Sequence, residues 1–162
     1  MVADNCPLMN VSAHSARNPD PLMERMGEVL RRCWGFGGFL PLQKQAMDCV
    51  CRGRDSIVVL PTGGGKSLCF QAPALVLPQL TLVLSPLIAL MKDQIDSLLE
   101  MGVPAGRLDS TLSHAERNET YDRLRARRLK LLYVSPERLL MPGFLDFLKG
   151  RGISSVAIDE AH

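Results

Sequence analysis

The sequence lacks the features that mark several large classes of protein. Aromatic residues make up only 5% of its 162 residues, and the formal net charge is only +2. A balance this close to neutral gives no overall electrostatic case for binding nucleic acid, so any such case must rest on local motifs. A chain of this length buries about two thirds of the surface that it exposes when unfolded. We therefore expect one compact domain with its own core.

Cysteine spacing and targeting signals exclude further classes. The five cysteines, Cys6, Cys33, Cys49, Cys51 and Cys69, contain no C-x-x-C pair. This pattern indicates neither a disulfide framework nor a zinc finger, and it favours reduced thiols in a cytosolic-type compartment. Residues 1–20 contain no apolar run typical of a secretory signal, so we interpret them as a flexible leader.

Residues 67–91 contain no charged residue and are long enough to imitate a membrane span. Glutamines and prolines at Gln71, Pro73, Pro78, Gln79 and Pro86 divide the run into pieces that are too short to cross a bilayer. We expect these pieces to be buried elements packed against one another, as in a parallel sheet, and we predict no membrane partner.

Helix and strand signals alternate along the chain. A helix is expected from Pro21, capped by Asp20, to about Cys33, and a second from Pro41 to about Cys51. Later helices are expected to end at Gly102 and to run from a Ser113–Glu116 capping box to about Arg128. Short aliphatic runs predict strands at 56–60, 80–84, 129–134 and 154–158. This alternation predicts an α/β fold with a mainly parallel sheet flanked by helices.

A polar cluster directly follows each predicted strand. The clusters are residues 61–67, Ser85-Pro86, Ser135-Pro136-Glu137 and residues 159–162, which read DEAH. Because the carboxyl ends of parallel strands share one edge of a sheet, we expect the four clusters to converge on one crevice.

The first cluster belongs to the segment LPTGGGKS, residues 60–67, between a predicted strand and a predicted helix. Glycines let consecutive backbone N–H groups point at phosphate oxygens, and the helix N-terminus adds its positive dipole end. The candidate cofactor-binding residues here are Thr62, Gly63, Gly64, Gly65, Lys66 and Ser67. We assign Lys66 to the β- and γ-phosphates and Ser67 to Mg²⁺. The alternative is a flexible glycine-rich turn.

The acidic pair Asp159–Glu160 ends the last aliphatic run. A carboxylate at a strand end can hold Mg²⁺, and its neighbour can orient or deprotonate the attacking water. We assign Asp159 to the metal and Glu160, with Lys66, to catalysis. Alone, such a pair is commonly a solvated turn. Together with the glycine-rich segment it predicts hydrolysis of a nucleoside triphosphate.

Four segments together resemble motifs I, Ia, Ib and II of the RecQ family of ATP-dependent DNA helicases in superfamily 2. They are LPTGGGKSLCFQ, LVLSPLIALMKDQ, LLYVSPERL and AIDEAH, and the resemblance runs from about Val29 to His162. It implies a RecA-like P-loop NTPase lobe over residues 21–162, with ATP and Mg²⁺ as cofactors. It also implies single-stranded and duplex DNA as partners, 3′ to 5′ unwinding, and roles in DNA repair and recombination. The implied location is the cytoplasm in a bacterium and the nucleus in a eukaryote.

Residues 34–47, WGFGGFLPLQKQAM, resemble the motif that precedes the P-loop in this family. The resemblance implies that Gln43 pairs with the adenine edge and that Phe36 stacks on the base. Leu40 stands where the family has arginine, which predicts altered ATP binding. The alternative is an amphipathic helix with an exposed glutamine.

The same resemblance implies that the loops at Ser85 and Ser135 touch DNA phosphates, although helix capping alone would explain both serines. Lys92 and Arg138 are weaker candidates for phosphate contacts. Five arginines between Arg117 and Arg128 are interleaved with acidic residues, so we interpret them as a solvated helix face.

The family pattern would continue beyond His162, so we expect a lobe truncated after the acidic motif, with weak turnover when isolated and an open apolar sheet edge. Two rival functions remain at this point. One is a binding module for nucleotide or single-stranded DNA that never turns over. The other is a superfamily 2 translocase that acts on RNA.

Overall fold

The protein is described by a computed structural model that covers residues 20–61 and 63–160. Its centre is a four-stranded sheet with the strand order β2-β3-β1-β4. The strands are β1 (Leu80–Leu84), β2 (Ala105–Leu108), β3 (Leu131–Val134) and β4 (Ile153–Ile158), and every pairing between them is parallel. The predicted α/β class with a parallel sheet is confirmed. The predicted leader, apart from Asp20, lies outside the described residues.

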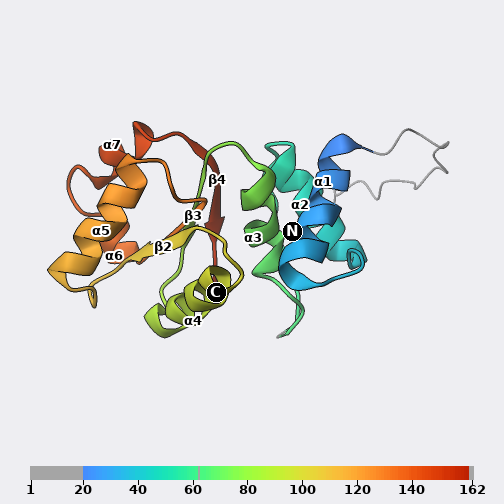
Figure 1. The fold of residues 1–162 in the computed structure, drawn as a ribbon, viewed down its shortest axis with the longest axis horizontal. Coiled ribbons are helices and arrows are strands. Elements are labelled where there is room, and N and C mark those ends of the chain that lie inside the picture. The colour runs from blue at the N-terminus through green and yellow to red at the C-terminus, as the bar shows by residue number, and fades with distance from the viewer. Residues whose placement is uncertain (1–19, 62, 161–162) are drawn as a thin grey trace, which may run out of the picture.

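Helices precede the sheet and connect its strands (Figure 1). They are α1 (Pro21–Val29), a π-helical turn η1 (Leu30–Trp34), α2 (Pro41–Cys51), α3 (Leu68–Val76), α4 (Ile88–Glu100), α5 (His114–Arg125), α6 (Pro136–Leu139) and α7 (Phe144–Lys149). Among the described helices, none is both long and apolar enough to span a membrane.

Local signals set most helix ends where the sequence predicts them. The Asp20 carboxylate accepts a hydrogen bond from the N–H of Leu22 and caps α1. Ser113 and Glu116 form the complete capping box of α5. Gly102, in the left-handed region at φ +74°, follows the end of α4. Each signal acts within a few residues and therefore does not depend on tertiary contacts.

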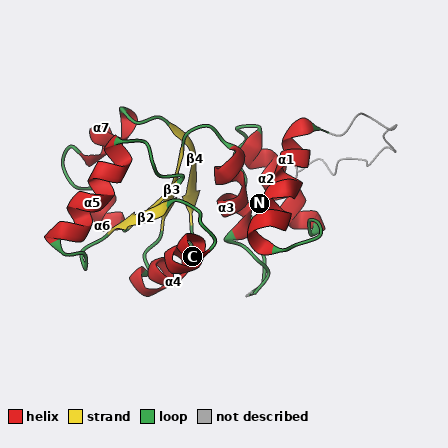
Figure 2. Cartoon of the chain, viewed as in Figure 1, coloured by secondary structure: helices red, strands yellow, loops and turns green. Residues whose placement is uncertain are grey.

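The core lies in layers on the two sides of the sheet. Alternate side chains of β3 point to opposite faces: Leu131 and Tyr133 pack against α3 and α4, whereas Leu132 and Val134 pack against α5 and α7. A third apolar cluster joins α1, η1, α2 and α3. Figures 1 and 2 show these layers, with α5 and α7 on one side of the sheet and α1, α2 and α3 on the other.

The predicted strand at residues 56–60 is wrong. The structure has irregular backbone there, and the side chains of Ile57 and Val59 are 96% and 85% exposed. A strand exists only where a neighbouring strand accepts and donates its hydrogen bonds, and no described strand pairs with this segment. On its free side β4 likewise has no described partner, and Val156 and Ile158 are 61% and 65% exposed. The expected open apolar edge is thus present among the described residues.

The strand β2 was not predicted. Its sequence, AGRL, has neither an aliphatic run nor clear alternation. Pairing with β3 makes it a strand, because the backbone of Ala105–Leu108 runs in register with that of Leu131–Val134. Gly106 matters in this packing, since a Cβ there would lie 3.1 Å from Leu129 Cδ1. Other boundaries also differ: β3 begins at Leu131, β4 begins at Ile153 and α5 ends at Arg125. The first helix is α-helical only to Val29 and continues as η1 to Trp34.

Candidate functional site

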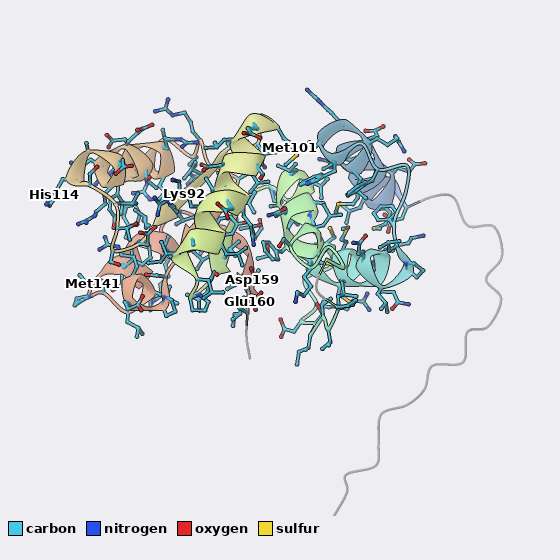
Figure 3. The ribbon with its side chains drawn as sticks, turned by 90° about the horizontal axis from the view of Figure 1, so that it is seen from below. Lys92, Met101, His114, Met141, Asp159 and Glu160 are labelled. Atoms are coloured by element: carbon cyan, nitrogen blue, oxygen red, sulfur yellow. The ribbon has the colours of Figure 1, made fainter. Side chains whose placement is uncertain are left out.

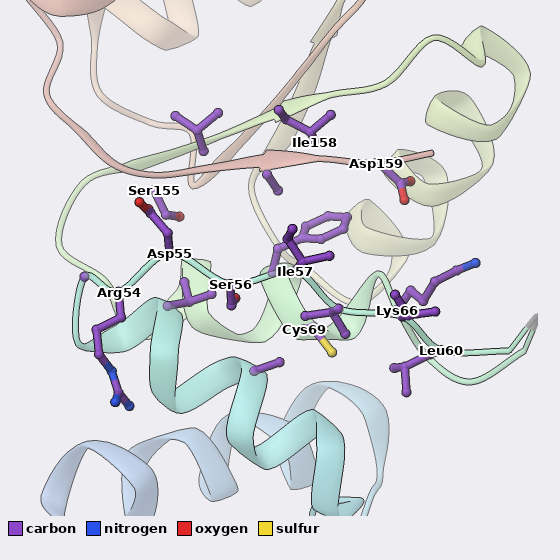
Figure 4. A pocket seen from close by; sticks show the side chains of 18 of the residues that line it. Arg54, Asp55, Ser56, Ile57, Leu60, Lys66, Cys69, Ser155, Ile158 and Asp159 are labelled. Carbon is purple, nitrogen blue, oxygen red and sulfur yellow. The ribbon is translucent and has the colours of Figure 1, made fainter. Parts of the chain in front are cut away.

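A hollow of about 620 Å³ runs along β4 to the acidic pair at its end. Residues 53–60 line one side and residues 154–160 of β4 and its extension line the other, with Lys66 and Cys69 between them (Figure 4). Lys66, Asp159 and Glu160 all line this one hollow, although more than ninety residues separate the lysine from the acidic pair. Figure 4 shows the Lys66 and Asp159 side chains at the same end of it.

The glycine-rich loop has the backbone that its composition predicts. Gly63 and Gly65 have φ angles of +80° and +71°, which an L side chain rarely adopts. Between them, a Cβ on Gly64 would lie 2.9 Å from the carbonyl oxygen of Pro61. The loop therefore needs glycine at three successive positions. Thr62 lies outside the described residues.

Lys66 and Ser67 connect this loop to α3. The N–H of Leu68 donates to the Gly65 carbonyl and that of Cys69 to the Lys66 carbonyl, so the chain turns helical directly after the glycines. Ser67 is the N-cap residue, and its side chain makes no capping hydrogen bond. The Ser67 hydroxyl is therefore not committed to the helix that it begins.

The acidic pair sits where β4 leaves the sheet, next to α4 (Figure 3). The N–H of Asp159 donates to the Leu84 carbonyl at 2.9 Å and extends the pairing of β4 with β1. Asp159 is buried, at 8% exposure, whereas Glu160 is half-buried with a φ of +55°. A positive φ outside glycine is uncommon and gives Glu160 a direction that a regular strand would not.

A chain of polar side chains leads to Asp159, and the sequence predictions did not include it. Gln71 and Tyr133 in this chain are buried and Gln94 is half-buried. Gln71 on α3 donates to the Tyr133 hydroxyl at 2.9 Å, and Tyr133 donates to Gln94 Oε1 at 2.9 Å. Gln94 Nε2 on α4 donates in turn to Asp159 Oδ2 at 3.3 Å. Burial raises the pKa of Tyr133 well above its ordinary value, so the phenol stays protonated. All three residues lie within the motifs quoted above, but their types alone signal no chemistry.

Gln43 and Phe36 are differently placed. Gln43 is buried at 6% exposure and its Nε2 donates to the Gly64 carbonyl at 3.1 Å, so its amide supports the glycine loop. The exposed amide of the alternative interpretation is therefore wrong. Phe36 is 48% exposed and Leu40 is 59% exposed. A contact from Gln43 to adenine would require this amide to leave Gly64.

The two serines at the strand ends differ in their capping. Ser135 caps α6 by accepting a hydrogen bond from the N–H of Arg138, as predicted. The predicted cap at Ser85 is wrong, because the N-cap of α4 is Leu87, in an extended conformation after Pro86. Ser85 and Ser135 are 1% and 2% exposed, and Ser85 Oγ is buried without a hydrogen-bond partner. Contact of either hydroxyl with a DNA strand would require these loops to open.

The two basic residues predicted to contact phosphate, Arg138 and Lys92, differ in exposure. Arg138 donates to the Tyr121 hydroxyl and lies over the rings of Tyr121 and Phe144, at 5.6 and 5.3 Å, so it packs within the domain. Lys92 is exposed near the start of α4. Arg125 pairs with Asp122 on the exposed face of α5, in agreement with a solvated helix face.

The structure describes Cys33, Cys49, Cys51 and Cys69 as free cysteines, and Cys6 lies outside the described residues. No group of three or more His, Cys, Asp or Glu side chains in the described part of the chain could hold a metal ion alone.

A family model for the DEAD/DEAH box helicases matches residues 40–162, which include the glycine loop and the acidic pair. The chain belongs to this helicase family. Its curated homologues include ATP-dependent DNA helicase RecQ of Pasteurella multocida, 44% identical over 88% of this chain and 22% of that protein. RecQ of Synechocystis is 47% identical over 86% of this chain and 30% of that protein. This helicase chain thus spans less than a third of the length of either relative.

Solved structures support the helicase fold. A DUF1998 helicase, MrfA, bound to DNA superposes with a TM-score of 0.62 at 23% identity, over 78% of this chain and 19% of that one. A hypothetical ATP-dependent RNA helicase from Sulfolobus tokodaii gives a TM-score of 0.57 at 19% identity, over 83% of this chain and 49% of that one. At these identities the likeness establishes the fold alone, which is the predicted RecA-like α/β arrangement.

Proposed function

We propose that this chain is the ATP-binding lobe, over residues 21–162, of a RecQ-like DNA helicase that couples ATP hydrolysis to 3′ to 5′ unwinding. One observation carries the nucleotide part: Lys66, which directly follows the glycine loop, and the acidic pair at the end of β4 line the same hollow. The similarity to four homologues named ATP-dependent DNA helicase RecQ, at 42–47% identity, supports DNA over RNA. The cytoplasm of a bacterium, or the nucleus of a eukaryote, would be its place of action.

The glycine loop would hold the phosphates of ATP. Gly63 and Gly65 have positive φ angles, a backbone form that can present amide N–H groups to an anion, and α3 adds its positive dipole end. Lys66 would neutralise the β- and γ-phosphates. Phe36 is exposed and would stack on the base. Gln43 supports the glycine loop through Gly64 and would pair with adenine only after releasing that carbonyl.

The donor set fits a magnesium ion that arrives with the nucleotide. Mg²⁺ prefers oxygen ligands and commonly takes one or two carboxylates together with substrate phosphates. The Asp159 carboxylate and the uncommitted Ser67 hydroxyl are such ligands, and the described residues contain no complete protein cage. When bound, the ion would neutralise charge on the phosphates.

Glu160 would orient the attacking water and accept its proton. Glu160 follows Asp159 in the chain and lines the same hollow. Its positive φ departs from the regular strand backbone. A half-buried carboxylate next to a more buried one can remain a base while the other holds a cation.

The test compares Lys66→Ala with the matched control Lys149→Ala. Lys149 lies on α7, on the far side of the sheet, in an exposed ion pair with Asp146. Binding of a fluorescent ATP analogue with Mg²⁺ and phosphate release are measured on the chain, with single-stranded DNA, with RNA and with neither. We expect Lys66→Ala to weaken binding at least about 10-fold, which corresponds to ~1.4 kcal/mol, and the control to bind normally.

The outcomes separate the rival functions. Phosphate release that rises with DNA supports the proposal, whereas stimulation by RNA alone supports an RNA translocase and overturns the DNA assignment. Binding that never leads to phosphate release, with or without DNA, identifies a binding module. If Lys66→Ala binds the ATP analogue as tightly as the wild type, the proposed nucleotide site is wrong.

A further inference from the structure

Four polar side chains from four different elements meet between the sheet and the helices on one of its faces. Gln71 lies on α3, Gln94 on α4, Tyr133 on β3 and Asp159 at the end of β4. Tyr133 is fully buried, Gln71 and Asp159 are 6% and 8% exposed, and Gln94 is half-buried. Buried polar networks of this kind are costly unless every member is satisfied, so their geometry is closely constrained.

The hydrogen bonds fix which end of the Gln94 amide faces Asp159. The Tyr133 hydroxyl accepts from Gln71 Nε2, so its single proton is available to Gln94 Oε1, at 2.9 Å. Gln71 Nε2 also donates to Gln94 Oε1 at 3.3 Å. With two donors on its oxygen, the Gln94 amide presents its NH₂ group to Asp159 Oδ2.

The Asp159 carboxylate is then held at both of its oxygens. Oδ2 accepts from Gln94, and Oδ1 accepts from the N–H of Glu160 at 3.2 Å. An ionised carboxylate has about four lone-pair sites, so two held in this way leave others for a cation. The two donors set the plane of the carboxylate before any ligand arrives.

We propose that Gln94 is a positioning residue that orients the Asp159 carboxylate toward the Mg²⁺–nucleotide, with Tyr133 acting through Gln94. This inference rests on the function proposed above. It also assigns a role to α4, since Gln94 lies one helical turn from Met91 and from Leu98, both of which pack into the core. The Gln94 amide is therefore carried by a helix that packs into the core.

The expected loss of Mg²⁺ affinity can be estimated from other metal sites. Removing a hydrogen-bond partner that orients a metal-binding side chain typically weakens metal affinity or activity about 10- to 100-fold. We expect Gln94→Ala to raise the Mg²⁺ concentration that half-saturates binding of a fluorescent, non-hydrolysable ATP analogue by about 10-fold. Tyr133→Phe keeps the ring and removes only the hydroxyl, so a smaller increase, about 3-fold, is expected.

The experiment titrates Mg²⁺ into the chain with this analogue for the wild type, Gln94→Ala, Gln94→Met, Tyr133→Phe and the double variant Gln94→Ala/Tyr133→Phe. Gln94→Met keeps the size of the side chain if alanine disturbs the packing. Gln79→Ala, an exposed glutamine at the opposite end of β1, is the matched control. Analogue binding in EDTA and thermal unfolding without nucleotide are measured in parallel.

Three results support the proposal: a shifted Mg²⁺ midpoint in both Gln94 variants, unchanged binding in EDTA, and a double variant no worse than Gln94→Ala. A Mg²⁺ midpoint within about 2-fold of wild type in both Gln94 variants would overturn it. So would an equal loss of binding with and without Mg²⁺, or additive effects of the two substitutions, because those belong to a structural role. If the wild type does not bind the analogue, or Lys66→Ala binds like wild type, the proposed function fails instead.

Discussion

Asp109 offers a direct test of how the end of β2 is held. Its side chain is fully buried and accepts hydrogen bonds from the N–H and hydroxyl of Thr111, at 2.8 and 2.6 Å, and from the Arg107 guanidinium. Burial pushes the pKa of Asp109 upward, but the Thr111 hydrogen bonds and the Arg107 charge outweigh burial and hold the pKa below its usual value. The ionised carboxylate therefore stabilises the folded state.

We expect Asp109→Ala to lower the free energy of unfolding by about 3 kcal/mol at pH 7. Removing one partner of a buried ion pair costs roughly 3–5 kcal/mol. The lower end applies because Arg107 keeps 18% of its side chain in water and retains a 3.1 Å hydrogen bond to Thr111. With a urea dependence of about 2 kcal/mol per molar, the midpoint of unfolding should fall by about 1.5 M.

The effect should depend on pH in a defined direction. Because the folded-state pKa is below the unfolded value of about 3.9, the stabilisation is complete above that pH and is lost as the pH falls through the folded pKa. The difference between wild type and Asp109→Ala should therefore be constant from about pH 5 to 8 and shrink below about pH 4. A variant within about 0.5 kcal/mol of wild type at pH 7, or a difference that grows in acid, would refute the reasoning.

Two further substitutions and one labelling experiment test local features of the fold. Gly65→Ala places a Cβ 2.4 Å from Gln43 Nε2 at a φ of +71°. It should lower the free energy of unfolding, measured in urea, by about 2 kcal/mol, and the loss should be smaller in a Gln43→Ala background. Equal losses with and without Gln43 would contradict this. Ser113→Ala removes the capping-box hydrogen bonds with Glu116 and should lower the free energy of unfolding by about 1 kcal/mol. An unchanged free energy of unfolding would show that the cap does not stabilise the protein. Burial, then nearby carboxylates, raise the pKa of Cys51 to about 11, so at pH 8 iodoacetamide should label it about 100-fold more slowly than an ordinary thiol. Mass spectrometry of native and urea-unfolded protein measures that ratio, which should approach one after unfolding.

Sequence reasoning succeeded where the physics is local. Asp20 before Pro21 and Ser113 three residues before Glu116 satisfy the first N–H groups of their helices with atoms only two or three residues away. The aliphatic run Leu80–Leu84 forms the strand β1 that its composition predicts. The glycine loop and the acidic pair are likewise readable, since glycine composition and strand-end position are properties of a few neighbouring residues.

Prediction failed where a residue's state depends on distant partners. Residues 56–60 resemble a strand in composition but have no described strand beside them, whereas Ala105–Leu108 resembles a loop and pairs with β3. Ser85 was predicted as a helix cap, yet α4 begins after Leu87. A β-strand and a buried hydroxyl are defined by neighbours across space, which no local pattern specifies.

By itself, then, the sequence determined the capped starts of α1 and α5, the glycine loop and the acidic pair, because each depends on contacts within a few residues. Only the tertiary structure decided that Gln43 supports Gly64 and that Gln71, Gln94 and Tyr133 lead to Asp159. Those hydrogen bonds join residues 21 to 65 positions apart. They form because packing two helices on a parallel sheet brings buried donors and acceptors together, and each must then find a partner away from water.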